Sequence, residues 1–346
     1  MEAKTVSIGK YPIGGGNPIR IQSMCNTPTA NVPATVKQIL ALEAAGCEIV
    51  RVSVPDGESA CAISEIKKQI HIPLVADIHF DYRLAIAAME HGADKVRLNP
   101  GNIGSPDRVR AVAQMAERCG IPIRIGVNSG SVEKDLLKTH GGPTAQALVE
   151  SALRHASLLE DCGFSNIVLS VKASDVRTTI EACRILREQT PYPLHLGVTE
   201  AGTFLSGTVK SAIGIGALLA DGIGDTIRVS LTDDPVQEIK IAKEILKALS
   251  LREFGAKLIS CPTCARTHID MIPLAKKVEG YLQTVDKPIT VAVMGCAVNG
   301  PGEAREADIG IAGGDGYGLL FQKGTPMKKV PEAGLFAALV QEIEKL

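Results

Sequence analysis

The 346-residue sequence has no tryptophan, only 3% aromatic residues, no long apolar run and almost no net charge. The N-terminal stretch MEAKTVSIGK lacks an apolar signal core, and no run approaches the roughly 18 residues of a membrane-spanning helix. A formal net charge of −1 gives no electrostatic reason to bind nucleic acid or an anionic membrane. We therefore expect a cytoplasmic protein whose partners include neither nucleic acids nor membranes.

Nine cysteines are present, an odd number that argues against a framework of disulfide bonds. In a reducing compartment, clustered cysteines bind metal or carry out redox chemistry. Cys261 and Cys264 lie in ISCPTCARTHID, and Cys296 follows in VMGCAVNGPGEAREAD. The other six cysteines mostly fall in helical patterns, where we expect buried free thiols.

Eight apolar, β-rich runs alternate with amphipathic helical patterns through residues 1–250. The runs span residues 19–24, 48–55, 73–80, 95–100, 122–128, 166–174, 193–200 and 225–231. The residues between successive runs suffice for one crossover helix each time. Eight such units in about 250 residues predict an α/β fold of the (β/α)8 TIM-barrel type. A doubly wound open sheet is the alternative, but no dinucleotide fingerprint follows the first run. The glycines of IGGGNP (13–18) are expected in a hairpin turn at the barrel bottom.

Residues 251–346 show a different pattern and carry all three clustered cysteines. Short strands are predicted at 256–260, 289–296, 307–313 and 318–324, with helices at 267–283 and 331–346. This pattern is typical of a small α+β domain. The predicted domains are therefore a barrel at 1–250 and a metal-binding domain at 251–346.

Polar residues interrupt the late part of every predicted barrel strand. They are Ser23, Arg51, Asp77, His79, Arg97, Asn99, Arg124, Asn128, Lys172, Glu200, Arg228 and Ser230. Several are spaced i, i+2, so their side chains point to one face of the strand. Any one of them alone is readily explained as a satisfied polar residue at a strand end. Together they predict an active site at the C-terminal ends of the strands, the mouth of the barrel.

Five of these residues are cationic: Arg51, Arg97, Arg124, Lys172 and Arg228. Converging cations repel one another and lose hydration, so folding alone does not favour them. An anion with several charged oxygens compensates, and the planar fork of arginine suits phosphate. The predicted substrate is a small phosphorylated compound, with a diphosphate favoured by the number of cations. Asp77, His79 and Glu200 remain for hydrogen bonding, proton transfer or orientation of the arginines.

The spacing of the three cysteines favours a [4Fe–4S] cluster over zinc. Zinc sites that open with C-x2-C usually close with a second pair of cysteines or histidines, and none follows Cys296. The nearby His268 falls in a predicted helix. Cys-Pro recurs at iron–sulfur sites, and Cys296 enters a Gly-Pro-Gly turn that lets backbone approach a cluster. A zinc-stabilised barrel enzyme without redox chemistry and a non-catalytic iron–sulfur carrier stay open as alternatives.

Seven motifs closely resemble the 4-hydroxy-3-methylbut-2-enyl diphosphate synthase family, in its short two-domain bacterial form. They are IGGGNPIRIQSM, ADIHFDYRLA, VRLNPGNIG, RIGVNSGS, LGVTEAG, CPTCART and GCAVNGPGEAREADIG. The resemblance covers essentially the whole chain. Ala265 stands where glycine is usual in this family, and Cys25 where threonine is common.

The resemblance implies an iron–sulfur oxidoreductase of the non-mevalonate isoprenoid pathway. The implied reaction is the two-electron reductive ring opening and dehydration of 2-C-methyl-D-erythritol 2,4-cyclodiphosphate to (E)-4-hydroxy-3-methylbut-2-enyl diphosphate, with reduced flavodoxin or ferredoxin as donor. One [4Fe–4S] cluster per chain would be held by Cys261, Cys264, Cys296 and Glu303. The implied substrate-binding residues are Arg51, His79, Arg97, Asn99, Arg124, Asn128, Lys172, Glu200, Arg228 and Ser230, with Glu200, Glu303 and His79 as catalytic.

The predicted eighth helix, 236–250, bears on assembly. It runs from the mouth to the bottom of the barrel, about 22 Å at roughly 1.5 Å per residue. The short link from Ser250 to Cys261 then leaves the cysteines far from the mouth of their own barrel. We therefore expect a head-to-tail homodimer in which each active site is shared between chains.

Overall fold

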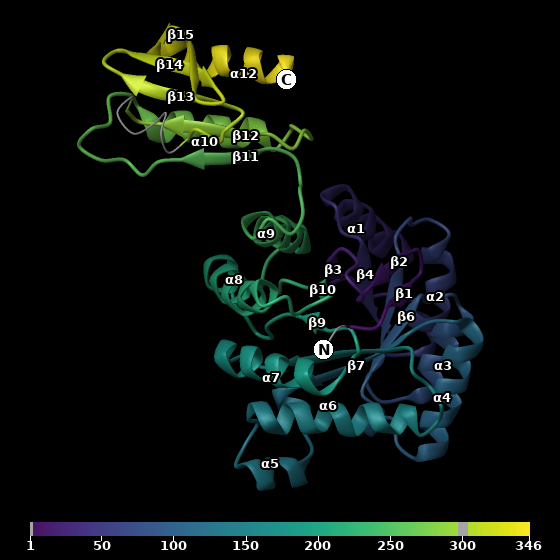
Figure 1. Cartoon of the computed structure of the whole chain (residues 1–346). Coiled ribbons are helices and arrows are strands. Elements are labelled where there is room, and N and C mark those ends of the chain that lie inside the picture. Colours follow the sequence, from purple (N-terminus) through teal and green to yellow (C-terminus); the bar gives the residue numbers. More distant parts are fainter. Residues whose placement is uncertain (1–2, 297–303) are drawn as a thin grey trace. The chain divides into compact units, whose positions relative to one another are not determined.

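The computed structural model describes residues 3–296 and 304–346. The chain divides into two compact units, Met1–Arg252 and Glu253–Leu346. The first unit contains an eight-stranded sheet and a two-stranded sheet, and the second a five-stranded sheet (Figure 1). Among the described residues, no helix combines the length and apolar character needed to cross a bilayer.

The eight predicted runs form one parallel sheet that curls into a barrel. Its strands are β3 (Arg20–Met24), β4 (Ile49–Ser53), β5 (Leu74–Asp77), β6 (Lys95–Leu98), β7 (Ile123–Asn128), β8 (Ile167–Lys172), β9 (His195–Leu196) and β10 (Thr226–Ile227). They are ordered β8-β7-β6-β5-β4-β3-β10-β9. A parallel bridge between Leu169 and Leu194 joins the two ends of this order. The barrel is therefore nearly closed, which confirms the TIM-barrel prediction over the open sheet.

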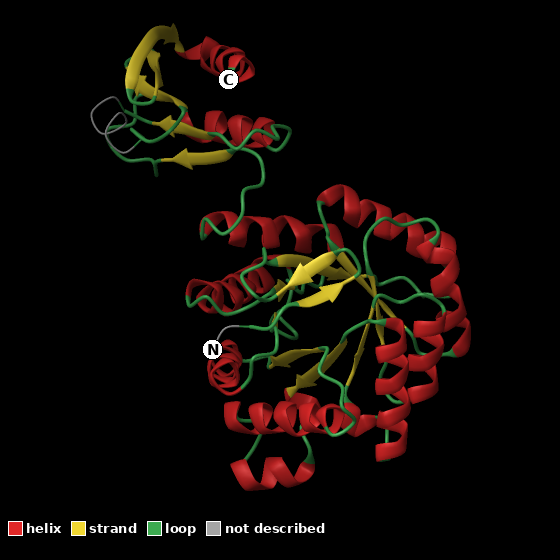
Figure 2. Ribbon diagram, turned by 45° about the vertical axis from the view of Figure 1, so that its right-hand side comes forward, coloured by secondary structure: helices red, strands yellow, loops and turns green. Residues whose placement is uncertain are grey.

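Helices surround the strands (Figure 2). They are α1 (Val32–Ala45), α2 (Gly57–Lys67), α3 (Tyr82–Glu90), α4 (Pro106–Cys119), α5 (Lys134–His140), α6 (Ala145–Glu160), α7 (Val176–Gln189), α8 (Phe204–Ala220) and α9 (Pro235–Ala248). Many begin at side chains that accept a hydrogen bond from a first-turn backbone N–H, as Asp56 does for α2 and Asp175 for α7. Where such a cap is present, it ends the strand-to-helix loop at a defined residue, which helps to fix that loop at the mouth.

Several strands end earlier than the sequence predicts. β5 ends at Asp77 instead of residue 80, and β9 and β10 contain two residues each. The apolar alternation misled the prediction because buried residues such as Val198 and Val229 continue it beyond the last ladder pair. His79, Glu200 and Ser230 consequently lie in the loops after their strands.

A hairpin of β1 (Val6–Ile8) and β2 (Tyr11–Ile13) closes the bottom of the barrel. Its apolar residues pack against Ile49, Val75 and Val168 in the early parts of three barrel strands. The turn lies at residues 9–10, so the prediction of a hairpin turn at 13–18 was wrong. Gly14, Gly15 and Gly16 follow the hairpin with φ between 55° and 75°, a backbone region that glycine adopts without a steric penalty.

The chain leaves the first unit at the barrel bottom. Arg252 Nη1 donates to Glu48 Oε2 at 2.6 Å and to the Ile19 carbonyl at 2.9 Å. Glu48 directly precedes β4 and Ile19 directly precedes β3. Both partners therefore lie at the N-terminal ends of barrel strands, opposite the mouth.

The second unit is an α+β fold around a mixed sheet. Its elements are β11 (Lys257–Ser260), α10 (Met271–Leu282), β12 (Thr290–Met294), β13 (Ile309–Gly314), β14 (Tyr317–Gln322), β15 (Thr325–Pro331) and α12 (Leu335–Lys345). β11, β12 and β13 are parallel, and β14 and β15 add antiparallel strands. The sequence reading missed β15 because two lysines and two prolines in TPMKKVP mask a strand, although such residues are typical of a protected edge. α10 begins at Met271, so placing His268 in a helix was wrong.

Candidate active site

The late parts of the barrel strands bring the five predicted cations together. Arg51, Arg97, Arg124 and Lys172 come from β4, β6, β7 and β8, and Arg228 directly follows β10. The four arginines all act electrostatically on Lys172. Arg124 is 2% exposed and Lys172 7% exposed. The mouth thus holds a buried cluster of positive charge.

Two buried carboxylates compensate part of this charge. Asp77 Oδ1 accepts a hydrogen bond from Arg97 Nη1 at 3.0 Å, and Asp77 Oδ2 lies 3.7 Å from Arg51 Nε. Burial alone would raise the pKa of the Asp77 carboxyl, but the combined attraction of the arginines outweighs it and the pKa lies below its usual value. Arg228 pairs with Glu238, a residue of α9.

Arg124 and Lys172 have no such compensation. Neither forms an ion pair with any residue in the described part of the chain, and Arg124 Nε and Nη1 lack hydrogen-bond partners there. Burial, reinforced by the neighbouring arginines, lowers the pKa of both side chains well below the ordinary values. Burial also lowers the pKa of Arg51 to about 10. Such groups favour a bound anion, because only an anion supplies the missing negative charge.

Two glycines make room for these cations. A Cβ atom at Gly126 would lie 2.7 Å from Arg97 Nε, and one at Gly197 would lie 2.6 Å from Lys172 Nζ. Neither distance is compatible with a normal contact. The glycines of RIGVN and LGVTE therefore keep the barrel interior open to long cationic side chains.

The remaining predicted residues occupy the rim. His79 is exposed in the bend after β5, beside the exposed ring of Phe80. Glu200 is exposed in the bend after β9 with φ of 51°, a left-handed conformation that is uncommon for a non-glycine residue and concentrated at functional sites. Asn99 is buried after β6, and its Oδ1 accepts a hydrogen bond from the Gly101 backbone N–H.

Asn128 and Ser230 are half-buried. Asn128 ends β7 and is paired in register with Lys172 on β8, whereas Ser230 lies two residues beyond Arg228. Ser23, expected at the mouth, instead donates to Glu238 of α9 at 2.9 Å. Its neighbours in β3, Gln22 and Met24, contact the interior cations Lys95 and Arg51.

The sequence reading missed three interior residues: Lys95, His195 and Glu238. Lys95 is fully buried with a 3.3 Å hydrogen bond to Gln22, and its spacing of two from Arg97 was an available signal. His195 Nδ1 forms a hydrogen bond with Thr226 Oγ1 at 2.8 Å. Burial, reinforced by the neighbouring cations, holds the pKa of the His195 imidazole well below its usual value. Glu238 was detectable in the sequence as a charged residue on the apolar face of a helix, three and four residues before the buried Ile241 and Ala242.

The three predicted cluster cysteines lie in the second unit, near the C-terminal ends of β11 and β12. Cys261 Sγ accepts a hydrogen bond from the Gly295 backbone N–H at 3.2 Å, directly before Cys296. Thr267 Oγ1 accepts a hydrogen bond from the Cys264 backbone N–H at 3.1 Å, and the His268 N–H donates to the Gly295 carbonyl. Both cysteine-bearing segments are thus held against each other.

Cys264 is exposed, and hydrogen bonds from Arg266 lower the pKa of its thiol, which favours the ligating thiolate. Among the residues that the structure describes, no three His, Cys, Asp or Glu side chains are close enough to hold a single metal ion. Glu303, the predicted fourth ligand, lies outside the described residues.

Of the other cysteines, Cys25, Cys47 and Cys183 are buried free thiols, as expected. Burial raises the pKa of each to about 12, which makes them poor nucleophiles. The expectation was wrong for Cys61 and Cys119, which are exposed on their helices.

The sequence matches two family descriptions in tandem: the GcpE TIM-barrel domain over residues 3–243 and the GcpE protein C-terminal domain over residues 257–345. The chain belongs to the GcpE family.

Curated members of the GcpE family resemble this chain over their whole length. A relative from Ruminiclostridium cellulolyticum is 58% identical, covering 100% of this chain and 98% of the relative. One from Caldicellulosiruptor saccharolyticus is 59% identical, covering 99% of each. Both are named 4-hydroxy-3-methylbut-2-en-1-yl diphosphate synthase (flavodoxin).

Solved structures of other enzymes share the barrel of this GcpE-family chain. Dihydropteroate synthase from Yersinia pestis has a TM-score of 0.51 at 11% identity, covering 71% of this chain and 98% of that structure. The 3-dehydroquinate dehydratase from Geobacillus kaustophilus has a TM-score of 0.51 at 16% identity, covering 71% of this chain and 98% of that structure. At these identities the likeness shows the fold alone.

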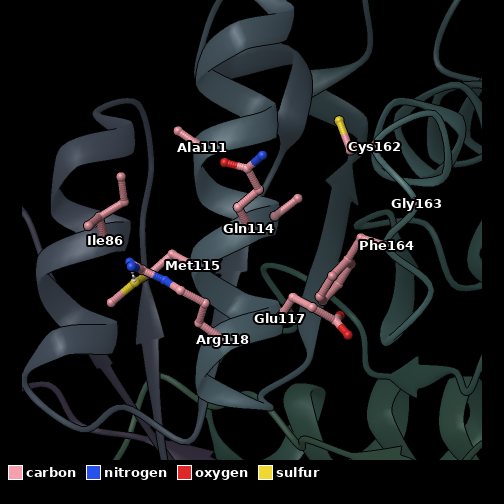
Figure 3. A pocket seen from close by; sticks show the side chains of 10 residues that line it. Ile86, Ala111, Gln114, Met115, Glu117, Arg118, Cys162, Gly163 and Phe164 are labelled. Carbon is pink, nitrogen blue, oxygen red and sulfur yellow. Dashed lines mark hydrogen bonds between the residues drawn. The ribbon is translucent and has the colours of Figure 1, made fainter.

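A separate groove of about 570 Å³ lies on the helix layer of the barrel (Figure 3). It is lined by residues of α3, α4 and the turn after α6, including Ile86, Gln114, Arg118 and Phe164. No residue of the mouth lines it. The groove is therefore separate from the mouth.

We expect Arg124→Met to stabilise the ligand-free protein while weakening anion binding. Removing a buried charge without a partner relieves repulsion, so the melting temperature should rise by about 2–4 °C. Affinity for inorganic diphosphate should fall about tenfold or more, because a charge-assisted contact is lost. Calorimetry and thermal unfolding measure both. Asp77→Asn is a control with the opposite expected effect. It should lower the melting temperature, because Arg51 and Arg97 lose their anionic partner.

Binding of diphosphate should take up protons. The lowered pKa of Lys172 means that the ligand-free fold binds fewer protons than the unfolded chain. Its stability therefore rises with pH between the lowered pKa and about 10.4, the ordinary value for lysine. A bound anion favours the charged amine, so affinity falls with rising pH across the same window. Calorimetry at about pH 8 in buffers of different ionisation enthalpy detects the uptake. Uptake that persists unchanged in Lys172→Met would contradict this assignment.

Proposed function

We propose that this chain catalyses the two-electron reductive ring opening of 2-C-methyl-D-erythritol 2,4-cyclodiphosphate. The ring substrate takes up two electrons and two protons, loses one water and gives (E)-4-hydroxy-3-methylbut-2-enyl diphosphate. Reduced flavodoxin, or a ferredoxin, supplies the electrons in the reducing cytoplasm. The curated relatives bear the name of this product and of flavodoxin.

The observation that carries the proposal is a pair of buried basic side chains, Arg124 and Lys172, that form no ion pair within the described part of the chain. A diphosphate carries the charge and the number of oxygens that these groups and the nearby arginines require. Relatives 58–59% identical over the full chain are named for a diphosphate product, so the chemistry of the mouth and the names agree. A non-catalytic electron carrier has no use for such a mouth.

The mouth residues supply binding and charge stabilisation. Ring opening breaks a carbon–oxygen bond to phosphate, and negative charge grows on the departing oxygen. Cations fixed in a water-poor interior stabilise that charge more than water does. Glu200 lies at the rim in an exposed bend, where its carboxyl group can hand a proton to the departing hydroxyl group. His79 and Asn99 lie after adjacent strands and supply further hydrogen bonds.

A [4Fe–4S] cluster fits the cysteines of the second unit. Cys261, Cys264 and Cys296 would hold three irons, and Glu303 the fourth. The donor set is suitable because Cys264 is biased toward the thiolate and the Gly295 N–H already donates to Cys261 sulfur, a contact of the kind that tunes cluster potential. A cluster is wider than a single ion, so its ligands need not converge on one point. When bound, the cluster supplies the electrons for the reduction.

Anaerobic reconstitution tests the proposed function. The wild-type chain should bind iron and acid-labile sulfide in equal amounts and convert the cyclodiphosphate with a chemical reductant. Cys261→Ser, Cys264→Ser and Cys296→Ser should each lose most of the iron and sulfide, because a thiolate ligand is removed. Cys61→Ser, at an exposed thiol of α2, is the matched control and should retain both. A colourless wild-type protein that binds zinc and shows no turnover would refute the proposal.

We also propose a head-to-tail homodimer with shared active sites. Arg252 anchors the end of the first unit at the barrel bottom, and eight residues separate it in sequence from Cys261. The nine Cα–Cα steps from Arg252 to Cys261 reach at most about 30 Å when fully extended, and four of the eight intervening residues form β11. The path around the outside needs the barrel height of about 22 Å plus the width of the helix layer. We therefore propose that the cysteines of one chain act at the barrel mouth of a second copy.

Helix α8 supports this assembly. It contains one charged residue, Lys210, and exposes the apolar residues Leu205, Val209 and Ile213 at helical spacing. Leu205 is 76% exposed, and Phe80 at the rim is 72% exposed. α8 begins four residues after Glu200, so its apolar face starts beside the mouth. A second copy of this chain that covers the face would bring its own cysteine unit to that rim.

Mixed dimers test the sharing. A Cys296→Ser chain and a Glu200→Ala chain should each be inactive alone. The two variants are mixed as folded proteins and allowed to exchange subunits. Each mixed dimer then contains one composite site with intact Cys296 and Glu200. Roughly a quarter of wild-type activity should return, since half the dimers are mixed and each has one intact site.

Leu205→Lys in both chains should abolish the rescue and shift the protein to the monomer by sedimentation. Leu40→Lys, an exposed leucine of α1, is the matched control and should leave the rescue unchanged. An absence of rescue in mixtures that demonstrably exchange subunits would rule out sharing.

A further inference from the structure

Glu238 is one of two carboxylates that the fold buries among the described residues, and the other is Asp77. It lies in the first turn of α9 and is 2% exposed. The start of α9 is fixed by Asp234, whose side chain accepts from the Val236 N–H, and by Pro235 at the first helical position. Glu238 thereby reaches from the helix layer toward the barrel strands.

Both oxygens of Glu238 are fully engaged. Oε1 accepts from Arg228 Nη2 at 3.1 Å and from the Leu231 backbone N–H at 3.1 Å. Oε2 accepts from Ser23 Oγ at 2.9 Å and from Arg228 Nε at 3.3 Å. The carboxylate thus binds one edge of the Arg228 guanidinium and links it by hydrogen bonds to β3 and to the loop after β10.

These hydrogen bonds leave one nitrogen of the Arg228 guanidinium, Nη1, available for a ligand. Nε and Nη2 are bound to Glu238, whereas the contact of Nη1 among the described residues is a long one, 3.8 Å, with Met24 Sδ. The same sulfur accepts from Arg51 Nη2 at 2.8 Å. Arg228 is therefore held by one edge beside a second arginine, and Nη1, which has no oxygen partner in the described part of the chain, can donate to an anionic oxygen.

We propose that Glu238 is a positioning residue, which holds the Arg228 guanidinium in the orientation that binds a diphosphate at the barrel mouth. The inference rests on the proposed function for its ligand class. Glu238 does not touch the ligand, and it acts through Arg228. It also couples the start of α9, the helix that leads out of the barrel, to the anion site.

A simple electrostatic role makes the opposite prediction. If Glu238 only offset positive charge, then Glu238→Gln would leave the mouth more positive and bind diphosphate more tightly. Under the positioning role, the glutamine amide cannot accept hydrogen bonds at both atoms. Arg228 then loses its fixed orientation, and affinity falls.

The experiment measures the affinity of inorganic diphosphate for the cluster-loaded protein by calorimetry. Glu238→Gln should weaken binding about tenfold, the effect of losing a charge-assisted hydrogen bond. Glu238→Asp should weaken it similarly, because the charge remains but the reach is shorter. Glu244→Gln, at an exposed carboxylate on the same helix, is the matched control and should bind as wild type.

A double-mutant cycle separates positioning from a general loss of structure. With Arg228→Met in the background, Glu238→Gln should cause no further loss, because no guanidinium remains to orient. Tighter binding by Glu238→Gln, wild-type affinity in Glu238→Asp, or a full additional loss in the Arg228→Met background would each overturn the inference. A wild-type protein that binds no diphosphate would instead contradict the proposed function.

Discussion

Burying a basic side chain without an ion-pair partner is costly, and among the described residues this barrel does so at Arg124 and Lys172. The rest of the first unit can be understood as what makes that arrangement tolerable. A nearly closed ring of strands and the hairpin beneath it supply the apolar burial. Gly126 and Gly197 leave space for the side chains, and Asp77 compensates two of the neighbouring arginines. The interior is stable in spite of its charge, and a bound anion completes it.

The distribution of carboxylates gives the mouth its order. Asp77 and Glu238 orient Arg51, Arg97 and Arg228 before any ligand arrives, which lowers the entropy lost on binding. Arg124 and Lys172 form no ion pair within the described part of the chain, so a bound anion favours their charged forms. The two groups therefore have different roles. The paired arginines present hydrogen-bond donors in fixed orientations, and the unpaired cations supply the net positive field that attracts an anion. An interior with every cation paired would be more stable and would bind an anion poorly.

The sequence predicted the barrel and the cation cluster because both follow from periodicity. Eight apolar runs imply eight strands, and a spacing of two places Arg228 and Ser230 on one side of the chain. It could not predict Glu238, since a helix residue's partner on a strand depends on packing between layers. It overextended β9 and β10, because buried residues continue the apolar alternation after hydrogen bonding between strands has stopped. The hairpin turn was misplaced for a related reason: glycines at 14–16 resemble a turn, while the turn itself uses Gly9 and Lys10.

The position of Arg252 links the two units to a requirement for assembly. Its contacts with Glu48 and Ile19 fix the chain at the barrel bottom, opposite the cations. The proposed reduction needs both the anion site and the cysteines, and only eight residues, four of them in β11, link Arg252 to Cys261. The homodimer proposed above answers this constraint, because the cysteines of a second copy would complete the site. In the proposed homodimer, a second copy would cover the apolar face of α8, which begins beside Glu200. Under this proposal the site is complete only in the dimer, so dissociation would separate electron delivery from substrate binding and leave each chain unable to turn over.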